Sequence, residues 1–525
     1  MAGLLLVAAQ LAIAQPLWLD DAGRPGAAAR EALGWLMQAE SEGLRPADYQ
    51  AAALAQALAA PPASPEAAAR LDAAISAAVL RYLAELRHGR VAPAQIGARY
   101  DSASAPPADL PALLRDSLAR GQPAEVLRAA TPPWPQYPVL REALAQYRAL
   151  ADHPAWRQPL PALPGGKLAA GARWDGLPAL AARLQSLGDL AAGDAIAPAA
   201  LDSTLQQGLK SFQRRHGLPA DGVLGKSTLE ALSVPPASRA RQLELALERL
   251  RLTPLPAAPH FIAVNVPSFM LSAFAQAEGD ARVAFEMRVI VGKALDTRTP
   301  LFDEDMRWIE FSPYWNIPNS IARGETVPKL RASPGYLAAQ GMEFVGPGGQ
   351  ISTAVTPEAL DAAATGQWRI RQRPGPKNAL GDIKFMLPNN QNIYLHHTPS
   401  VGLFERARRD FSHGCIRIEE PVALAQWVLQ GDPQWSAERI RAAMGRPRPV
   451  VAPLPAPVPV LITYSTVAVH GERVHFAPDL YRQDPLLEQA LRRRAGASVA
   501  AAAPPNQPPA TVTLFSGAPV SIAAK

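Results

Sequence analysis

The chain has very little cysteine and few aromatic residues: one Cys among 525 residues, and 6% Phe, Trp and Tyr. A single Cys leaves no partner for a disulfide within the chain. The excess of positive charge is mild, at +6, and the Lys and Arg residues are scattered rather than concentrated in a run interleaved with aromatics. That distribution argues against a nucleic-acid partner. No segment after the N-terminus is long and apolar enough to span a bilayer.

The one cysteine stands in an unusual setting. Cys415 follows Ser412, His413 and Gly414, and a predicted strand, 391–396, ends nineteen residues before it on a histidine. A thiol enzyme needs a thiolate nucleophile, a neutral imidazole to accept its proton and backbone N–H donors for the oxyanion. The alternative is a small buried residue that serves only to fill space. A buried core position of that kind is rarely flanked by two polar residues and a glycine.

Two strings carry a resemblance to a known family. The residues from Ile393 to Pro399, followed by those from Ser412 to Arg417, resemble the signature of the L,D-transpeptidases, the cysteine enzymes that cross-link peptidoglycan. In that signature a histidine on a strand precedes a Ser-His-Gly-Cys element by about this interval. The resemblance implies that Cys415 is the nucleophile, that His396 is the base and that the carbonyl of His397 orients the imidazole.

His413 is the rival candidate for the base. It is closer to Cys415 in sequence, but alternation along a strand only points residues 413 and 415 the same way and does not guarantee contact. We therefore assign His396 as the base and His413 as a supporting catalytic residue. Gly414 completes the predicted catalytic set, because glycine permits close approach of an oxyanion to the surrounding backbone N–H groups.

Four further residues are assigned to substrate binding. Arg417 and Tyr394 are candidates to hold substrate carboxylate or carbonyl groups, and a structural role is equally open for each. His397 and Ser412 lie within the same two strings and are assigned with them. No metal and no cofactor is predicted, since one Cys with adjacent histidines lacks the spacing of a zinc site.

The resemblance extends over residues 258–432, which we expect to form a mostly β, sandwich-like catalytic domain. The residues from Trp315 to Pro318 and from Arg373 to Gly381 resemble the larger bacterial members, which carry a substrate-covering insertion. Between them, residues 319–367 are rich in helix-forming sequence interrupted by glycines, which predicts a helical lid that excludes water from an acyl-enzyme. A loop insertion without a catalytic role is the alternative.

Two helical units are predicted before the catalytic domain. Residues 16–160 contain amphipathic stretches, for example 28–38 and 67–87, and resemble the N-terminal scaffold of the larger transpeptidases. Residues 175–235 combine helical spacing with Asp-Gly and Gly-Lys turns, and resemble the three-helix peptidoglycan-binding domain of wall enzymes. A spacer role is the alternative for this second unit. The predicted fold class is therefore multidomain α+β.

The chain after residue 432 is predicted to form an extension and a tail. Residues 433–494 are expected to pack on the catalytic domain, with a hairpin over 458–476. Residues 495–525 are too poor in large apolar groups to form a core and are expected to be disordered. Proline-rich stretches expected to be linkers lie at 235–236, 254–259 and 447–459.

Residues 1–15 begin with an apolar run that ends in Ala-x-Ala at residue 14, the shape of a signal peptide without its positive n-region. A simple apolar helix is the alternative. We expect this segment to be a signal or a membrane anchor and the protein to be exported to the periplasm, where the substrate implied by the resemblance lies. The expected partners are peptidoglycan stem peptides, with peptidoglycan synthases and carboxypeptidases as candidate protein partners.

The predicted function is a peptidoglycan L,D-transpeptidase. As the resemblance implies, Cys415 attacks the carbonyl between the third residue of a tetrapeptide stem and its terminal D-Ala, and a second stem resolves the acyl-enzyme into a 3→3 cross-link. An L,D-carboxypeptidase or another wall cysteine hydrolase would use the same residues with water as the acceptor. A non-catalytic peptidoglycan-binding protein is the alternative of another class, and for it Cys415 would be dispensable.

Overall fold

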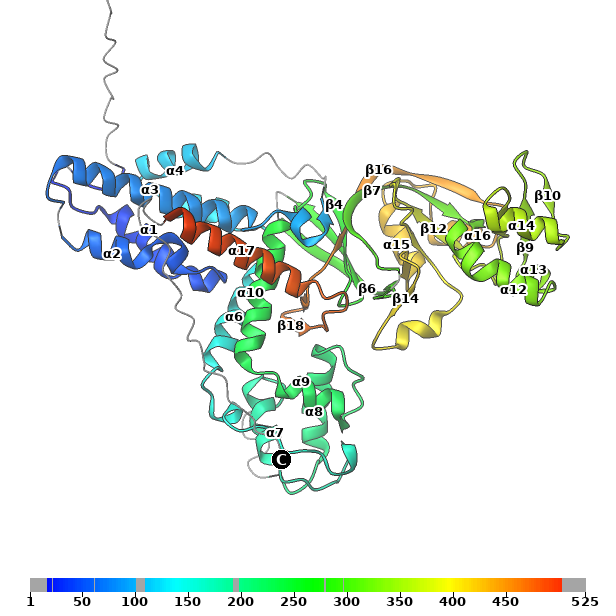
Figure 1. Cartoon of the computed structure of the whole chain (residues 1–525), viewed down its shortest axis with the longest axis horizontal. Helices are drawn as coiled ribbons and strands as arrows, with labels where there is room; N and C mark the ends of the chain where they lie inside the picture. Colours follow the sequence, from blue (N-terminus) through cyan, green and yellow to red (C-terminus); the bar gives the residue numbers. More distant parts are fainter. Residues whose placement is uncertain are drawn as a thin grey trace, which may run out of the picture.

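A computed structural model describes residues 17–502 apart from 21, 61, 101–108, 192–197, 278–279 and 296. The expectation for residues 1–15 lies outside the described residues. Within the described part of the chain, no helix has the length and apolar character needed to cross a membrane. Figure 1 shows an N-terminal group of helices, a small helical module below it, a central β domain and an insertion at the far end.

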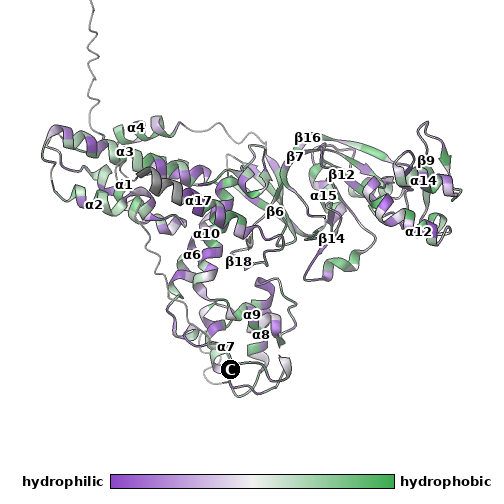
Figure 2. Cartoon of the chain, in the orientation of Figure 1, coloured by the Kyte–Doolittle hydropathy of each residue, from purple (hydrophilic) through white to green (hydrophobic). Residues whose placement is uncertain are grey.

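The N-terminal domain is helical, as predicted. The longest helix, α3 (Pro65–His88), begins after Ser64, whose hydroxyl accepts a hydrogen bond from the Ala67 N–H at 3.2 Å, and a proline occupies its first position. Figure 2 shows hydrophobic and hydrophilic residues alternating along these helices, as expected for helices with one buried face. The other helices are α1 (Ala27–Met37), α2 (Ala51–Leu58), α4 (Leu110–Ala119), α5 (Ala124–Ala130) and α6 (Gln136–Ala149).

The small module contains three α-helices: α7 (Leu177–Ser186), α8 (Ser203–Arg215) and α9 (Lys226–Ser233), with a short ladder of β2 (Lys167–Leu168) and β3 (Leu224–Gly225). Helix α8 is capped by the Asp202 carboxylate, which accepts a hydrogen bond from the Leu205 N–H at 2.9 Å. The buried Gln213 side chain accepts from the Gly222 N–H at 2.9 Å and donates to the Val223 carbonyl at 2.9 Å. These bonds fix the predicted Asp-Gly turn against α8.

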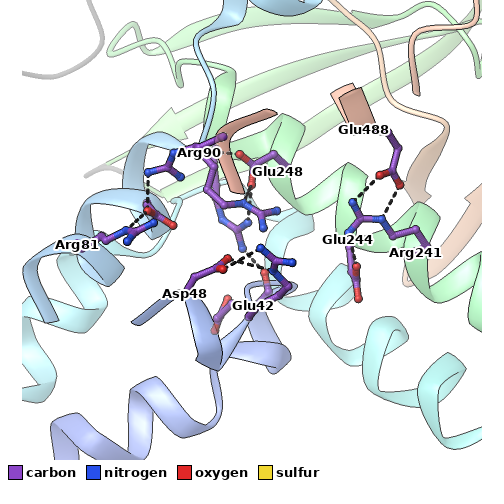
Figure 3. A network of polar contacts seen from close by, with 12 residues as sticks. Glu42, Asp48, Arg81, Arg90, Arg241, Glu244, Glu248 and Glu488 are labelled. Carbon is purple, nitrogen blue, oxygen red and sulfur yellow. Dashed lines mark hydrogen bonds and ion pairs between the residues drawn. The ribbon is translucent and has the colours of Figure 1, made fainter. Parts of the chain in front are cut away.

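Helix α10 (Pro236–Leu252) joins the N-terminal domain to the β domain. Its residues Leu243 and Leu247 belong to the N-terminal core, whereas Leu245 and Leu252 belong to the core of the β domain. A polar network adds to this apolar contact, as Figure 3 shows. Its members include the buried Glu248, which pairs with Arg90 at 3.0 Å and Arg251 at 3.2 Å, and Arg241, which pairs with Glu488 at 2.6 Å.

The β domain is built on one large sheet in the order β7-β12-β13-β15-β6-β5-β4-β16. Strand β16 pairs with β4 on one side and with β7 on the other, so the sheet closes on itself rather than ending in two open layers. The short β1 (Ala98–Arg99) and β14 pair with β7 and β6. The strands are β4 (His260–Asn265), β5 (Met270–Ala277), β6 (Asp280–Gly292), β7 (Leu301–Phe311), β12 (Ile383–Met386), β13 (Leu395–His396), β14 (Asp410–Ser412), β15 (Ile416–Ile418) and β16 (Val450–Thr463).

The expected linker at 447–459 is wrong, because most of it belongs to strand β16. Prolines stand at every second position from 453 to 459, and the pairing of β16 with β7 is irregular between Pro453 and Val458. Prolines are tolerated in a strand at such irregularities, where no ladder N–H is required. The predicted hairpin over 458–476 also needs correction. Residues up to Thr463 belong to β16, and the hairpin is β17 (Val467–His470) with β18 (Arg473–Phe476).

The C-terminal extension contributes more than a surface layer. Helices α15 (Pro421–Val428) and α16 (Ala437–Met444) precede β16. The hairpin of β17 and β18 packs between the N-terminal domain and the small module through residues such as Val467 and Phe476. Helix α17 (Asp484–Ala502) then continues into residues 495–502, which were expected to be disordered. The rest of the predicted tail, 503–525, lies outside the described residues.

The insertion has its own core and is not purely helical. It contains a four-stranded sheet in the order β10-β9-β11-β8, and it buries Leu330, Phe344 and Ile370. Because β8 and β11 pair with each other, the unit extends beyond the predicted 319–367 to residues 315–372. Its elements are β8 (Trp315–Asn316), α11 (Asn319–Ile321), a π-helical turn (Ala322–Thr326), α12 (Val327–Ala332), α13 (Tyr336–Ala339), β9 (Met342–Val345), β10 (Ile351–Ser352), α14 (Pro357–Thr365) and β11 (Arg369–Gln372).

Candidate active site

The segment that carries the cysteine is a tight loop between β14 and β15. Gly414 has a φ of +115°, and a Cβ there would lie 3.3 Å from the Ile393 side chain, so the position favours glycine. The Ser412 hydroxyl accepts from the Gly414 N–H at 3.1 Å and donates to the Cys415 carbonyl at 2.5 Å. The Thr299 hydroxyl donates to the Gly414 carbonyl at 2.7 Å. These bonds hold the backbone on both sides of the thiol.

The strand that ends on His396 lies directly beside the strand that follows Cys415. β13 and β15 pair in parallel, with Leu395 opposite Ile416 and His396 opposite Arg417. Because side chains alternate along a strand, residues 394, 396, 415 and 417 project from the same face. The structure thus brings together the predicted nucleophile, the predicted base and two predicted substrate-binding residues, Tyr394 and Arg417.

The thiol of Cys415 is partly exposed and faces the Asn392 carbonyl at 3.4 Å. Burial raises the pKa of the Cys415 thiol above its usual value, whereas hydrogen bonding with Tyr394 and the positive charges of Lys384 and Arg417 act in the opposite direction. The thiol is therefore mostly protonated at neutral pH.

His396 is 4% exposed, and its Nδ1 lies 2.5 Å from the His397 carbonyl oxygen. A carbonyl oxygen only accepts hydrogen bonds, so Nδ1 carries the ring proton and Nε2 is left as the acceptor. Burial, followed by the positive charge of Arg417, lowers the pKa of His396 to about 3. The imidazole is neutral at physiological pH and is in the tautomer that a general base requires.

The other predicted histidines have different surroundings. The His397 side chain turns away to Asp382, with Nδ1 and the carboxylate oxygen 2.8 Å apart, so only its carbonyl faces His396. His413 Nε2 lies 2.7 Å from the Glu325 carboxylate on the π-helical turn of the insertion. His413 therefore connects the catalytic loop to the insertion.

Ser412 and Arg417 differ in their availability to a ligand. Ser412 is 2% exposed and both of its side-chain hydrogen bonds stay within the loop, which favours a structural role over the substrate contact that was expected. The Arg417 guanidinium has no acidic partner among the described residues, and its buried Nε has no hydrogen-bond partner there. A guanidinium in that state is suited to bind a carboxylate.

Sequence reasoning missed two charged neighbours of the site. In the sheet, Lys384 is paired with His396 on one side and with Glu310 on the other. The Lys384 ammonium lies 4.0 Å from the centre of the Tyr394 ring, and burial lowers the pKa of Lys384 and raises that of Glu310. A lysine between Ile383 and Phe385 was visible in the sequence, but its sheet neighbours were not.

The described residues contain no group of three or more His, Cys, Asp and Glu side chains placed to hold a metal ion. The groups on this face are one thiol, one neutral imidazole, an aromatic hydroxyl, two cations and, next to Lys384, the Glu310 carboxyl group.

Comparisons with known proteins agree on the domain content. Residues 12–144 match a family described as a scaffold domain, residues 175–232 match the "Putative peptidoglycan binding domain", and residues 259–441 match the L,D-transpeptidase catalytic domain (YkuD). A protein of Haemophilus influenzae named "Putative L,D-transpeptidase" is 30% identical over 273 residues, which cover 51% of this chain and 54% of that protein. The chain therefore spans about half the length of this relative.

Two solved structures are also similar in part. Bd1075 of Bdellovibrio bacteriovorus is 14% identical, with 46% of this chain and 56% of that chain covered and a TM-score of 0.18. A fused Zn-dependent amidase/peptidase/peptidoglycan-binding domain-containing protein from Clostridium acetobutylicum is 10% identical, with 56% and 98% covered and a TM-score of 0.16. TM-scores this low do not indicate a shared overall fold.

Proposed function

The chain carries an L,D-transpeptidase catalytic domain behind a scaffold domain and a peptidoglycan-binding domain, and from this premise we propose that it forms 3→3 cross-links in peptidoglycan through an acyl-enzyme on Cys415. The observation that carries the proposal is the shared sheet face of Cys415 and His396, where a neutral imidazole is oriented by the His397 carbonyl. Such domains act outside the cytoplasm, and we place this one in the periplasm.

In the first step Cys415 Sγ attacks the carbonyl of the third stem residue, meso-diaminopimelate in our proposal. The C–S bond forms, the bond to the D-Ala nitrogen breaks, and the thiol proton passes through His396 Nε2 to the leaving amine. Burial raises the pKa of the Cys415 thiol and lowers that of His396, so a stable thiolate–imidazolium pair does not form before the attack. The proton is transferred during the attack. In the second step the side-chain amine of another stem attacks the thioester, the C–N bond forms and the C–S bond breaks. A proton from the amine passes through His396 Nε2 to Sγ and restores the thiol.

The oxyanion formed in each step requires backbone donors. The Gly414 N–H already donates to the Ser412 hydroxyl at 3.1 Å, whereas the Cys415 N–H has no hydrogen-bond partner among the described residues. We therefore assign the Cys415 N–H as the main donor among the backbone N–H groups that surround Gly414. Arg417 is assigned to a substrate carboxylate because no acid of the described chain occupies it.

The insertion, residues 315–372, is proposed to act as the lid. Its Glu325 reaches His413, two residues before the nucleophile, so the contact couples the position of the insertion to the catalytic loop. A closed insertion would exclude water and favour an amine as the acceptor. Peptidoglycan synthases and carboxypeptidases remain candidate partners that supply tetrapeptide stems.

The test is incubation of the purified chain, and of Cys415→Ala, with disaccharide-tetrapeptide, followed by mass spectrometry. The proposal predicts a dimer that lacks one D-Ala from the wild-type chain and no product from the variant. A tripeptide product alone would identify an L,D-carboxypeptidase. Sacculus binding without any product would identify a non-catalytic wall-binding protein.

A further inference from the structure

A cleft of about 670 Å³, separate from the Cys415 site, lies where the small module, the β domain and the C-terminal hairpin meet. Figure 1 shows the module of α8 and α9 directly below β18 of the C-terminal hairpin, which α8 contacts. One wall is formed by the end of α8 and the turn after it, at Arg214 and Gly217–Leu218. A second wall is formed by the turn at 267–270, Arg288 and residues 407–409. The third wall is formed by His470 and residues 475–480.

The cleft has an excess of positive charge. Four arginines line it, against one acidic residue, Asp479. The lining histidine His475 adds no positive charge at neutral pH, because burial lowers its pKa to about 4. The Asp479 carboxylate is committed to its own loop, where it accepts hydrogen bonds from the Gln483 and Asp484 N–H groups at 2.8 and 3.0 Å. Among the described residues it forms no ion pair with the cleft arginines, but its negative charge still counts against theirs.

Two of the arginines are not neutralised by an acid. Arg214 is exposed and has no side-chain partner among the described residues. Arg409 is buried and donates to the carbonyls of Val289 at 3.2 Å, Arg406 at 2.8 Å and Phe269 at 3.1 Å, without a carboxylate. Burial lowers the pKa of Arg409 to about 10, so its charge persists at neutral pH.

The other two arginines are neutralised by acids outside the cleft lining. Arg288 pairs with Glu405 at 2.9 Å and also with Glu419, and Arg408 pairs with Asp410 at 2.6 Å. Apolar side chains such as Phe269 and Phe476 share the lining. An apolar floor rimmed by guanidinium groups suits a ligand that presents both uncharged backbone or sugar surface and carboxylates.

The position of the cleft indicates which ligand this is. One wall is the end of α8 in the peptidoglycan-binding domain, and another leads through β14, residues 410–412, directly to the catalytic loop. We propose that the cleft binds the carboxylates of a peptidoglycan stem peptide, outside the site at Cys415, and so holds the wall polymer against both domains. This inference rests on the proposed function.

The test compares sedimentation of the full chain with native sacculi and with sacculi whose carboxylates have been amidated. The variants are Arg214→Gln and the double variant Arg214→Gln with Arg408→Gln, each checked for an unchanged melting temperature. Arg173→Gln is the matched control, since Arg173 is an exposed arginine of the same domain that does not line the cleft. It removes the same charge from another surface.

On native sacculi the single variant is expected to bind roughly 2- to 5-fold more weakly and the double variant roughly 5- to 20-fold, as for the loss of one and two exposed ion pairs. The control should change binding less than about 2-fold. On amidated sacculi wild type and variants should bind alike. Equal losses in the control, no loss on native sacculi, or the same loss on amidated sacculi would each overturn the proposal.

Failure of this inference is distinguishable from failure of the proposed function. Formation of the cross-linked dimer by wild-type protein from soluble disaccharide-tetrapeptide tests the reaction at Cys415 without the polymer. If the wild type forms the dimer and the cleft variants bind sacculi normally, the reaction at Cys415 is supported and the role of the cleft in wall binding is refuted.

Discussion

Replacing His396 by Gln is expected to slow acylation of Cys415 by roughly 10²-fold or more, the usual effect of a positioned general base. A factor of 10² corresponds to about 2.7 kcal/mol of activation free energy. His396 is buried on the nucleophile's sheet face, with its accepting nitrogen left free by the bond from Nδ1 to the His397 carbonyl. His413→Gln is the matched control and should cost less, since that ring pairs with Glu325.

The same geometry predicts how the wild-type rate depends on pH. His396, with its pKa lowered to about 3, stays neutral as the pH falls from 8 to 5, and the Cys415 thiol, with its pKa raised, stays protonated over that range. Neither group changes its charge, so the acylation rate should be nearly flat between pH 5 and 8. An imidazole of ordinary pKa would instead lose its basic form below about pH 6.5.

The assay is single-turnover acylation followed by intact-protein mass spectrometry at several pH values, with circular dichroism to verify that the fold persists. Equal losses in the two histidine variants, or a larger loss for His413→Gln, would show that the base is wrongly assigned. A steep fall in the wild-type acylation rate near pH 6.5 would refute the claim that His396 is neutral and the Cys415 thiol is protonated in the resting enzyme.

Three other predictions concern the surroundings of the site and the domain junction. Glu325→Gln removes the carboxylate that His413 contacts and should lower the ratio of cross-linked to hydrolysed product by roughly 2- to 5-fold, the effect of losing one exposed polar contact. An unchanged ratio would leave the insertion without a role in excluding water. Lys384→Met removes a positive charge that favours the Cys415 thiolate, so alkylation of Cys415 by iodoacetamide at pH 8 should slow by roughly 3- to 10-fold. An equal or faster alkylation rate would contradict a stabilising effect of Lys384 on the thiolate. Glu248→Gln leaves buried arginines unpaired and should lower the free energy of unfolding by about 3–5 kcal/mol in urea titrations. Asp20→Asn, at an exposed pair, is the control and should leave the urea midpoint nearly unchanged.

Local strings were enough to predict the centre of the site. A few residues, such as Gly414, determine the conformation of the loop at 412–417 and of the strand that ends at His396. The two segments lie side by side because both belong to one sheet. The α-helical regions were also predictable, because α3 and α8 have caps and one buried face that can be seen in the sequence.

What the sequence did not reveal depends on register and on distant contacts. Lys384 and Glu310 become neighbours of the site only through the alignment of β12 with β13 and β7. The contact between His413 and Glu325 joins residues 88 positions apart. The proline-rich segment of β16 has the composition of a linker, and only its partners β4 and β7 make it a strand.

The central claim is that the one thiol of the chain forms the acyl-enzyme, and a β-lactam of the carbapenem class tests it most directly. The resemblance to the L,D-transpeptidases suggests this class as an inhibitor that acylates the nucleophile. Intact-mass spectrometry should show one acyl group per chain, which peptide mapping places on Cys415, and none on Cys415→Ala. Acylation that persists in Cys415→Ala would contradict the account.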